Sequence, residues 1–87
     1  MTTRYCYFNG KIVPESKASV SVRDMAVLRG YAMFEFLRTY NGRLFHFKDH
    51  IKRFRNSARL LGLRVPVSDK EIESVLKQLV RKNRFKE

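Results

Sequence analysis

Cysteine and long apolar runs are what this sequence has least of. Cys6 is the single cysteine, so no internal disulfide can form, as is usual in a reducing compartment. No apolar run approaches the roughly 20 residues that a membrane-spanning helix needs. The first ten residues, MTTRYCYFNG, also lack the apolar centre of a signal peptide. We therefore expect a cytoplasmic protein with no membrane partner, in which Cys6 is a small core residue.

Several catalytic motifs are missing as well. The four glycines stand far apart, so there is no glycine-rich phosphate loop. His46 and His50 have the spacing of helical zinc ligands, but HFKDH lacks the glutamate of H-E-x-x-H, and no third ligand stands at a suitable distance. The lysines fall in turns or polar helix positions, where nothing desolvates an amine enough to make it a nucleophile. We expect no metal site and no self-contained covalent catalysis.

Acidic side chains are scarce too. Eight Asp and Glu oppose 19 Lys and Arg, which gives a net charge of +11. Such a charge is typical of nucleic-acid-binding proteins, so a basic nucleic-acid-binding module is one candidate function. It is equally expected of one part of a larger protein whose remainder is more acidic. The chain shows no known recognition motif and no aromatic stacking residues on its basic helix face, so we do not expect a nucleic-acid partner.

Two Asn-Gly pairs mark tight hairpin turns. The first lies within 5–13, YCYFNGKIV, and predicts two short strands, the second of them ending at Pro14. Residues 19–22 alternate polar and apolar and predict another extended segment, and residues 23–31 are compatible with a short helical turn before Gly30. The second Asn-Gly pair, at 41–42, predicts a hairpin between the strand 33–40 and RLFHF.

The predicted strand 33–40 carries charged groups on both faces. Alternation places Arg38 on one face with Phe34, Phe36 and Tyr40. Glu35 falls on the other face, between apolar neighbours. Glu35 and Arg38 are therefore expected on opposite faces of this strand.

The second half of the chain has helical periodicity. A helix over 48–61 is predicted by the spacing of Ile51, Phe54, Ala58 and Leu61, and Gly62 is suited to end it. A second helix is predicted to begin after Ser68, which stands at capping-box spacing from Glu71, and to run to about Asn83. The fold class is α+β, an antiparallel hairpin-rich sheet followed by two helices. Each element shows one apolar face that needs a partner surface.

Arg53 differs from the other basic residues of the first helix. Lys52, Arg55 and Arg59 lie opposite the apolar stripe, on what is usually the solvated side. Arg53 lies at the flank of the stripe, where its stem can pack while the guanidinium reaches a polar pocket. A planar fork of donors suits phosphate oxygens. Arg53 is therefore a candidate ligand of an organic phosphate.

Residues 7–63 resemble the N-terminal part of class IV aminotransferases, the fold-type IV pyridoxal-phosphate enzymes. These include branched-chain and D-amino acid aminotransferases, with aminodeoxychorismate lyase as a relative. The shared motifs are, in order, NGK, RD, GxxxFE, R-T-Y-N-G, H-I-x-R-F and S-A. Each is short, but their order and spacing together are specific.

The resemblance implies roles for particular residues. In the family the arginine of the H-[I/L]-x-R-[L/F] motif holds the cofactor phosphate, and it falls on Arg53. The aromatic residue before the glutamate lines the substrate pocket, which implies that Phe34 binds substrate. Arg38, on the same face, becomes a substrate-binding candidate, so the resemblance implies that this face borders a polar substrate site. Glu35, on the other face, is more consistent with a structural role. Arg29 stands where many members have tyrosine, and its fork could bind a substrate carboxylate.

Other departures concern specificity and completeness. The run 29–32 replaces Tyr-Gly-Asp-Gly, and Phe36 replaces a small glycine common in branched-chain enzymes; both favour a D-amino acid substrate over a branched-chain one. No lysine here matches the family's Schiff-base lysine motif, so no catalytic residue is assigned. Residues 1–87 are therefore expected to be an N-terminal small-domain fragment, inactive alone, whose parent extends past Glu87 with a strand-rich segment and the lysine-bearing large domain.

The resemblance implies a pyridoxal 5'-phosphate-dependent transferase. Its substrates would be an amino acid, branched-chain or D, and a 2-oxo acid, and the full-length enzyme would be a homodimer. An aminodeoxychorismate lyase-like enzyme is the alternative within the family, and the nucleic-acid module is the alternative of another class. The amino donor and its stereochemistry are left open.

Overall fold

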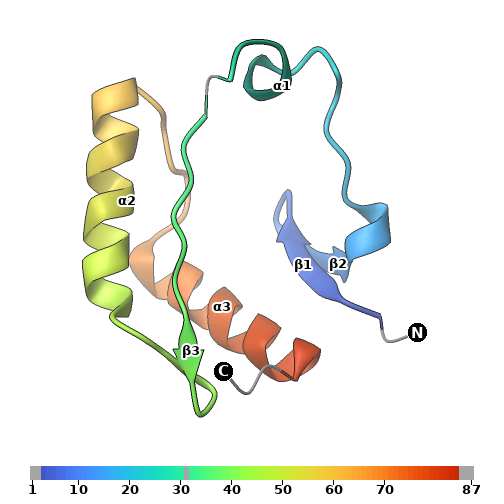
Figure 1. Ribbon diagram of the computed structural model, residues 1–87, viewed down its shortest axis with the longest axis vertical. Helices are drawn as coiled ribbons and strands as arrows, with labels where there is room; N and C mark the ends of the chain where they lie inside the picture. The colour runs from blue at the N-terminus through green and yellow to red at the C-terminus, as the bar shows by residue number, and fades with distance from the viewer. Residues whose placement is uncertain (1–2, 31, 85–87) are drawn as a thin grey trace.

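Two small antiparallel hairpins and two long helices form the described part of the chain, residues 3–30 and 32–84, in the computed structural model (Figure 1). The elements are β1 (Tyr5–Phe8), β2 (Lys11–Pro14), the 3₁₀ turn η1 (Glu15–Lys17), α1 (Met25–Arg29), β3 (Thr39–Tyr40), β4 (Arg43–Leu44), α2 (Phe47–Leu61) and α3 (Asp69–Asn83). The predicted α+β class, with hairpins first and two helices after them, is confirmed.

Both predicted hairpins form around their Asn-Gly pairs. Strand β1 pairs with β2, and β3 with β4. In each turn asparagine and glycine both have positive φ, 50° and 84° at 9–10 and 51° and 76° at 41–42. These are the angles of a type I′ turn, which glycine adopts without steric cost and asparagine tolerates.

Two predicted extended segments do not form strands as expected. Residues 19–22 pair with no described strand, and Val20 and Val22 are 63% and 76% exposed. Of the predicted strand 33–40, only β3 is paired. The remainder runs extended along α2 (Figure 1) without a described strand beside it. Strand formation requires a neighbouring strand, which alternation alone cannot predict.

The predicted helical turn before Gly30 is present as α1. The Asp24 side chain accepts a hydrogen bond from the backbone N–H of Ala26 at 2.8 Å, which caps the first turn. Gly30 ends the helix in the left-handed conformation, with φ 65°. Tyr31, the last residue of the predicted segment 23–31, lies outside the described residues.

Helices α2 and α3 begin and end close to the predicted positions. Gly62 ends α2 with φ 68°, and its N–H donates to the last carbonyls of the helix. Ser68 Oγ accepts from the N–H of Glu71 at 3.1 Å, so the predicted cap of α3 is confirmed. Neither helix, nor any other in the described ranges, has the length and apolar character to span a bilayer.

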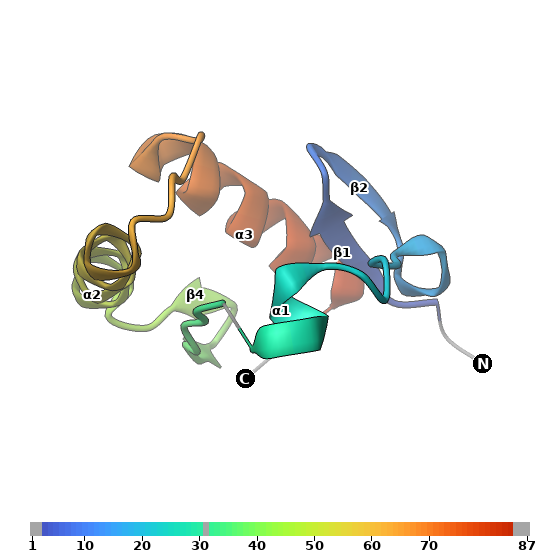
Figure 2. The same ribbon diagram turned by 90° about the horizontal axis from the view of Figure 1, so that it is seen from above.

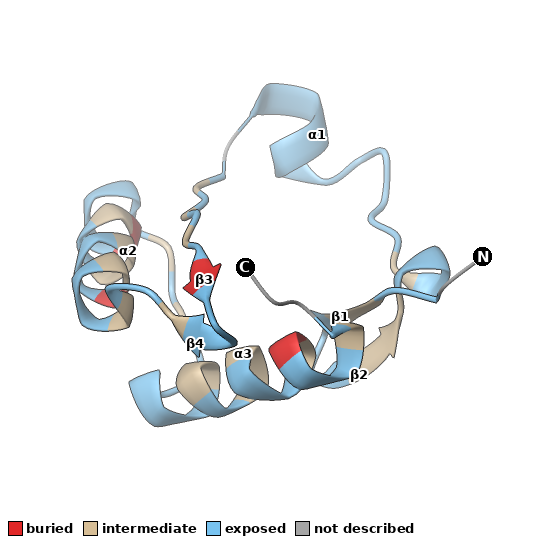
Figure 3. Ribbon diagram, turned by 60° about the horizontal axis from the view of Figure 1, so that its bottom comes forward, coloured by how far each residue is buried: buried red, intermediate tan, exposed pale blue. Residues whose placement is uncertain are grey.

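The described chain forms a thin layer with little interior. Its extents are 35 × 31 × 18 Å, and α3 runs between α2 and the β1–β2 hairpin (Figure 2). Among the described residues, the buried apolar side chains are Ile51, Ala58 and Val80. Figure 3 shows that most of the ribbon is exposed or half-buried. The apolar helix faces are therefore only partly covered. This agrees with the expectation that each element needs a partner surface. Cys6, predicted as a core residue, is half-buried.

Two side chains tie the elements together. Asn83, the last residue of α3, accepts from the N–H of Tyr5 at 2.7 Å and donates to the Tyr5 carbonyl at 2.9 Å. Arg55 donates to Asp69 Oδ1 at 2.9 Å and to the carbonyl of Val67 at 2.6 Å. The prediction that Arg55 lies on an ordinary solvated face is therefore wrong, because the loop between the helices folds back onto it.

Candidate functional site

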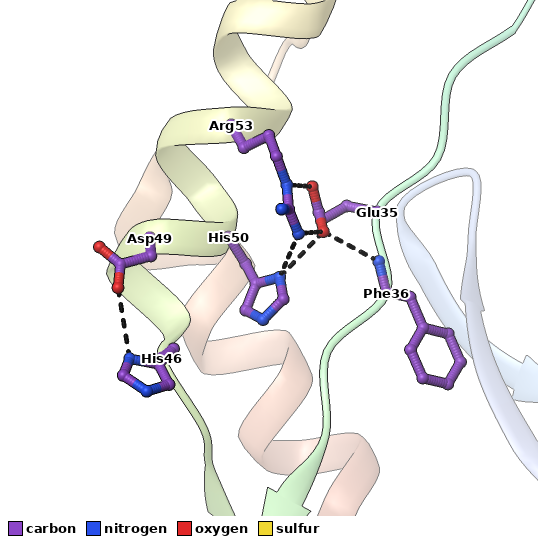
Figure 4. A network of polar contacts seen from close by, with 6 residues as sticks. All are labelled: Glu35, Phe36, His46, Asp49, His50 and Arg53. Carbon is purple, nitrogen blue, oxygen red and sulfur yellow. Dashed lines mark hydrogen bonds and ion pairs between the residues drawn. The ribbon is translucent and has the colours of Figure 1, made fainter.

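The site predicted around Arg53 lies where the extended segment before β3 passes α2. Exposure alternates along this segment: Glu35 and Leu37 are half-covered, while Phe34, Phe36 and Arg38 are exposed. The predicted division of the two faces is therefore confirmed, even though the segment is unpaired. Glu35 lies on the less exposed face of the segment, and its side chain points to α2, where it contacts His50 and Arg53 (Figure 4).

Glu35 and Arg53 form a two-pronged ion pair across 18 residues of sequence. Arg53 Nε donates to Glu35 Oε2 at 2.8 Å, and Arg53 Nη2 donates to Oε1 at 2.5 Å. The carboxylate is also fixed by the backbone N–H of Phe36, which donates to Oε1 at 3.2 Å. The Glu35 side chain is 16% exposed and that of Arg53 is 65% exposed. Glu35 is thus the anchored partner, and Arg53 the partner that reaches solvent.

His50 stands one helical turn before Arg53 and completes the cluster. Its Nδ1 lies 2.9 Å from Glu35 Oε1 and 3.3 Å from Arg53 Nη2. A protonated Nδ1 donates to the carboxylate, whereas an unprotonated one accepts from the guanidinium. Either way the ring borders the ion pair, and its side chain is 18% exposed.

These contacts keep both members of the pair charged. Hydrogen bonds from Arg53 and then from His50 lower the pKa of Glu35 from 4.5 to about 2. The hydrogen bond with Glu35, reinforced by its charge, raises the pKa of Arg53. Near neutral pH the carboxylate is therefore ionised and remains an acceptor for the guanidinium.

The pair uses only one edge of the Arg53 guanidinium. Nε and Nη2 form that edge, so the end that carries Nη1 and the second hydrogen of Nη2 faces away from Glu35 (Figure 4). This end is a planar pair of donors on a largely exposed side chain, and its Nη2 also lies 3.3 Å from His50 Nδ1. Its chemistry suits an oxygen anion, such as a phosphate or carboxylate group.

The other predicted site residues do not join this cluster. In the described part of the chain, the polar contacts of Arg53 are with Glu35 and His50. Phe34 is 87% exposed and Arg38 is also exposed, and both lie on the outward face of the segment. Arg29 is the exposed last residue of α1. Phe34 and Arg38 thus share a face as predicted, whereas Arg29 belongs to a different element.

An open apolar hollow of about 990 Å³ lies beside the cluster. Its lining comes from β1, the segment 35–40, β4, α2, the loop between the helices and α3; it includes Leu37, Phe54, Val67 and Leu76. Glu35 and His50 reach its border, as does Arg38, but Arg53 does not line it. The candidate anion site is therefore distinct from this hollow.

The two histidines do not converge on one point. His46 precedes α2, as expected, and its Nδ1 lies 3.3 Å from Asp49 Oδ2. His50 is directed to Glu35 instead (Figure 4). Within residues 3–30 and 32–84, no three His, Cys, Asp or Glu side chains are grouped so that they could hold a metal ion.

Comparison with known proteins identifies the family. The model of the family described as amino-transferase class IV matches residues 32–87, more than half of the chain. The chain belongs to the class IV aminotransferases. The matched segment includes Glu35, His50 and Arg53, so the whole polar cluster lies within the family region.

Individual class IV aminotransferases cover nearly all of the chain. It is 38% identical over 81 residues to a Methanocaldococcus jannaschii protein named as a putative branched-chain-amino-acid aminotransferase, covering 93% of this chain and 28% of the relative. It is 34% identical over 77 residues to a D-alanine aminotransferase of Staphylococcus epidermidis, covering 88% of this chain and 27% of that protein.

A solved structure confirms the fold. A branched-chain amino acid aminotransferase of the organism abbreviated T.th., complexed with N-(5'-phosphopyridoxyl)-L-glutamate, superimposes with a TM-score of 0.88 at 34% identity. The match covers 98% of this chain and 30% of that enzyme. The chain therefore spans less than a third of the length of these relatives and has the fold of the corresponding part of a class IV aminotransferase.

The contacts of two residues of the cluster were not predicted from the sequence. Glu35 was expected to be structural, and His50 was considered as a metal ligand and as part of the H-I-x-R-F motif. Two features of the sequence indicated them. Strand alternation places Glu35 on the face opposite Arg38, and the three-residue spacing places His50 on the same side of a helix as Arg53. Neither feature says that the segment and the helix lie side by side.

Proposed function

We propose that the chain is the N-terminal small domain of a pyridoxal-phosphate-dependent aminotransferase. The complete protein would transfer an amino group between an amino acid and a 2-oxo acid, as a homodimer. Family membership, the names of the relatives and the phosphopyridoxyl compound in the solved branched-chain enzyme support this proposal. The reactive lysine would come from outside these residues, and the chain alone would be inactive.

The donor set of the site fits the phosphate of this cofactor. The free end of the Arg53 guanidinium offers two N–H directions in one plane, which match two phosphate oxygens. Bound there, the cofactor would supply an electron sink for amino transfer. The chain's own contribution is to hold the phosphate through Arg53 and to shape the substrate side through Phe34, Arg38 and Arg29.

The names of the relatives give two candidate classes of amino donor for the complete protein. One relative is named for branched-chain amino acids and the other for D-alanine. Arg29, where many family members have tyrosine, and Phe36, where branched-chain enzymes often have glycine, favour the D-amino acid class. Assays of D- and L-amino acids against 2-oxoglutarate with the complete protein would separate the two classes. A lyase would release product without requiring a 2-oxo acid.

The nucleic-acid alternative draws on the net charge of +11. Of the basic residues on helix α2, Arg55 is paired with Asp69 and hydrogen-bonded to the loop between the helices. These intramolecular contacts leave Arg55 less available for a phosphate backbone. The amino transfer proposal accounts for more of the site.

The first prediction concerns Arg53. In the complete protein, Arg53→Ala should weaken retention of pyridoxal phosphate by about tenfold or more, because a charge-assisted pair of hydrogen bonds is lost. Cofactor remaining after dialysis, measured by visible absorbance, gives the result.

Arg59→Ala is the matched control for this measurement. Arg59 is an exposed arginine of the same helix, and its hydrogen bond is to Asn56 one turn away. Arg55 is unsuitable, because its contacts with Asp69 and the interhelical loop are structural. Equal cofactor retention in Arg53→Ala and Arg59→Ala would contradict the proposed phosphate role.

A further inference from the structure

We propose that Glu35 is a positioning residue for Arg53, holding its guanidinium so that the free end is turned to the cofactor phosphate. This inference rests on the proposed function. It assigns to Glu35 a share in phosphate binding without any contact with the phosphate itself. The observation behind it is that the Glu35 carboxylate binds the Nε–Nη2 edge of the guanidinium, so that the end with Nη1 is available to a ligand.

Glu35 can position Arg53 because its own place is fixed. Its carboxylate receives hydrogen bonds from two nitrogens of Arg53 and from the N–H of Phe36, and His50 lies against the same oxygen. Its side chain is 16% exposed, against 65% for Arg53. An exposed arginine samples many rotamers, and restricting it before the ligand arrives reduces the entropy lost on binding.

The charge of Glu35 acts in the opposite direction. A carboxylate repels a phosphate, and if that effect dominated, removing the charge would tighten binding. The guanidinium lies between the two anions, however, because the carboxylate meets Nε and Nη2 while a phosphate would meet the opposite end. Distance and the intervening positive charge both weaken the repulsion. We therefore expect orientation to outweigh repulsion.

A simpler role for Glu35 is to attach the extended segment to α2. That role would make Glu35 important for folding, but it would treat ligands with and without phosphate alike. Positioning of Arg53 instead predicts a loss confined to the phosphate. Pyridoxal, which lacks the phosphate, therefore separates the two roles.

The experiment measures dissociation constants of pyridoxal phosphate and of pyridoxal for the complete protein freed of cofactor. Glu35→Gln keeps the size of the side chain but replaces one acceptor oxygen with an NH₂ group that faces the Arg53 donor. It should weaken pyridoxal phosphate binding about tenfold and leave pyridoxal binding within about twofold of wild type. Glu73→Gln is the control, since Glu73 lies on α3 with Lys77 as its partner at 3.6 Å.

A second comparison uses Arg53→Ala as background. There, Glu35→Gln should add no further loss of pyridoxal phosphate affinity, because the guanidinium it positions is gone. Should Glu35→Gln fail to fold, Glu35→Asp replaces it. Its carboxylate keeps the charge but is too short to reach both nitrogens, and the expected loss is again specific to the phosphate.

Three results would overturn the inference: unchanged or tighter binding of pyridoxal phosphate by Glu35→Gln, an equal loss for both ligands, or a further loss in the Arg53→Ala background. A different result would contradict the proposed function instead. If Arg53→Ala leaves the preference for pyridoxal phosphate over pyridoxal intact, Arg53 does not bind the phosphate. The two failures are therefore distinguishable.

Discussion

A single carboxylate, Glu35, joins the extended segment to helix α2. Its oxygens accept from the Phe36 N–H and from two nitrogens of Arg53, and His50 lies beside them. An ionised carboxylate makes stronger hydrogen bonds to charged donors than a neutral carboxylic acid does. Protonation of Glu35 therefore weakens the junction.

The pH dependence of this junction follows from the lowered pKa of Glu35, about 2 against an ordinary value of 4.5. A group whose pKa is lower in the folded protein stabilises it fully above the ordinary pKa, and that contribution is lost as the pH falls toward the folded value. The difference in free energy of unfolding between wild type and Glu35→Gln should therefore be constant above about pH 5 and shrink between about pH 4.5 and 2.

Urea unfolding of the two proteins at a series of pH values measures this difference. Comparing variants removes the contribution of the other carboxylates, which both proteins share. A difference that stays constant down to pH 2 would show that Glu35 has no lowered pKa in the folded protein.

At the scale of single residues, the sequence predicted which face of its element a residue occupies but not which residue it contacts. Alternation placed Glu35 opposite Arg38, and helical spacing placed Arg53 at the flank of the apolar stripe; both placements agree with the structure. The contact between Glu35 and Arg53 joins residues 18 apart in sequence. It depends on the path of the segment along α2, which no local pattern encodes.

At the scale of the elements, polar side chains join the described helices to strands where no backbone hydrogen bonds connect them. The Asn83 amide bonds both the N–H and the C=O of Tyr5, as a neighbouring strand would, and so joins the end of α3 to β1. The ammonium group of Lys82 also lies 4.4 Å from the centre of the Tyr5 ring. The β1–β2 hairpin is therefore attached to the helical layer at Tyr5.

Asn83→Ala should loosen that attachment. The backbone N–H and C=O of Tyr5 lose their partners, and an unsatisfied, partly buried polar group costs about 1 kcal/mol. Hydrogen exchange in the peptide containing β1 should become about fivefold faster in the complete protein. Gln78→Ala, which removes an exposed hydrogen bond to Ser74 on the same helix, should leave this exchange unchanged; equal acceleration in both variants would contradict the role of Asn83.

Elements with local signals were predictable, and elements that depend on distant partners were not. Asn-Gly turns, the Gly62 cap and the Ser68 cap each act within a few residues, so the hairpins and helices follow from the sequence. The segments 19–22 and 33–38 have suitable alternation, but no described strand lies beside them. Arg55 was misplaced for the same reason, because the loop that covers it returns from ten or more residues away.

Over the whole molecule, the described chain is a layer 18 Å thick with an open apolar hollow of about 990 Å³. The same chain covers 27% to 30% of the relatives described above. The hollow and the thin core are consistent with the proposal that this is one domain of a larger enzyme. Glu35 and His50 reach the border of this hollow, whereas Arg53, the residue proposed to bind the phosphate, does not line it.

The most direct test is a crystal structure of the complete protein with pyridoxal phosphate bound. We predict a phosphate oxygen about 2.7–2.9 Å from Nη1 of Arg53, with Glu35 still hydrogen-bonded to Nε and Nη2. A phosphate held elsewhere, with the Arg53 guanidinium directed to solvent, would contradict the account.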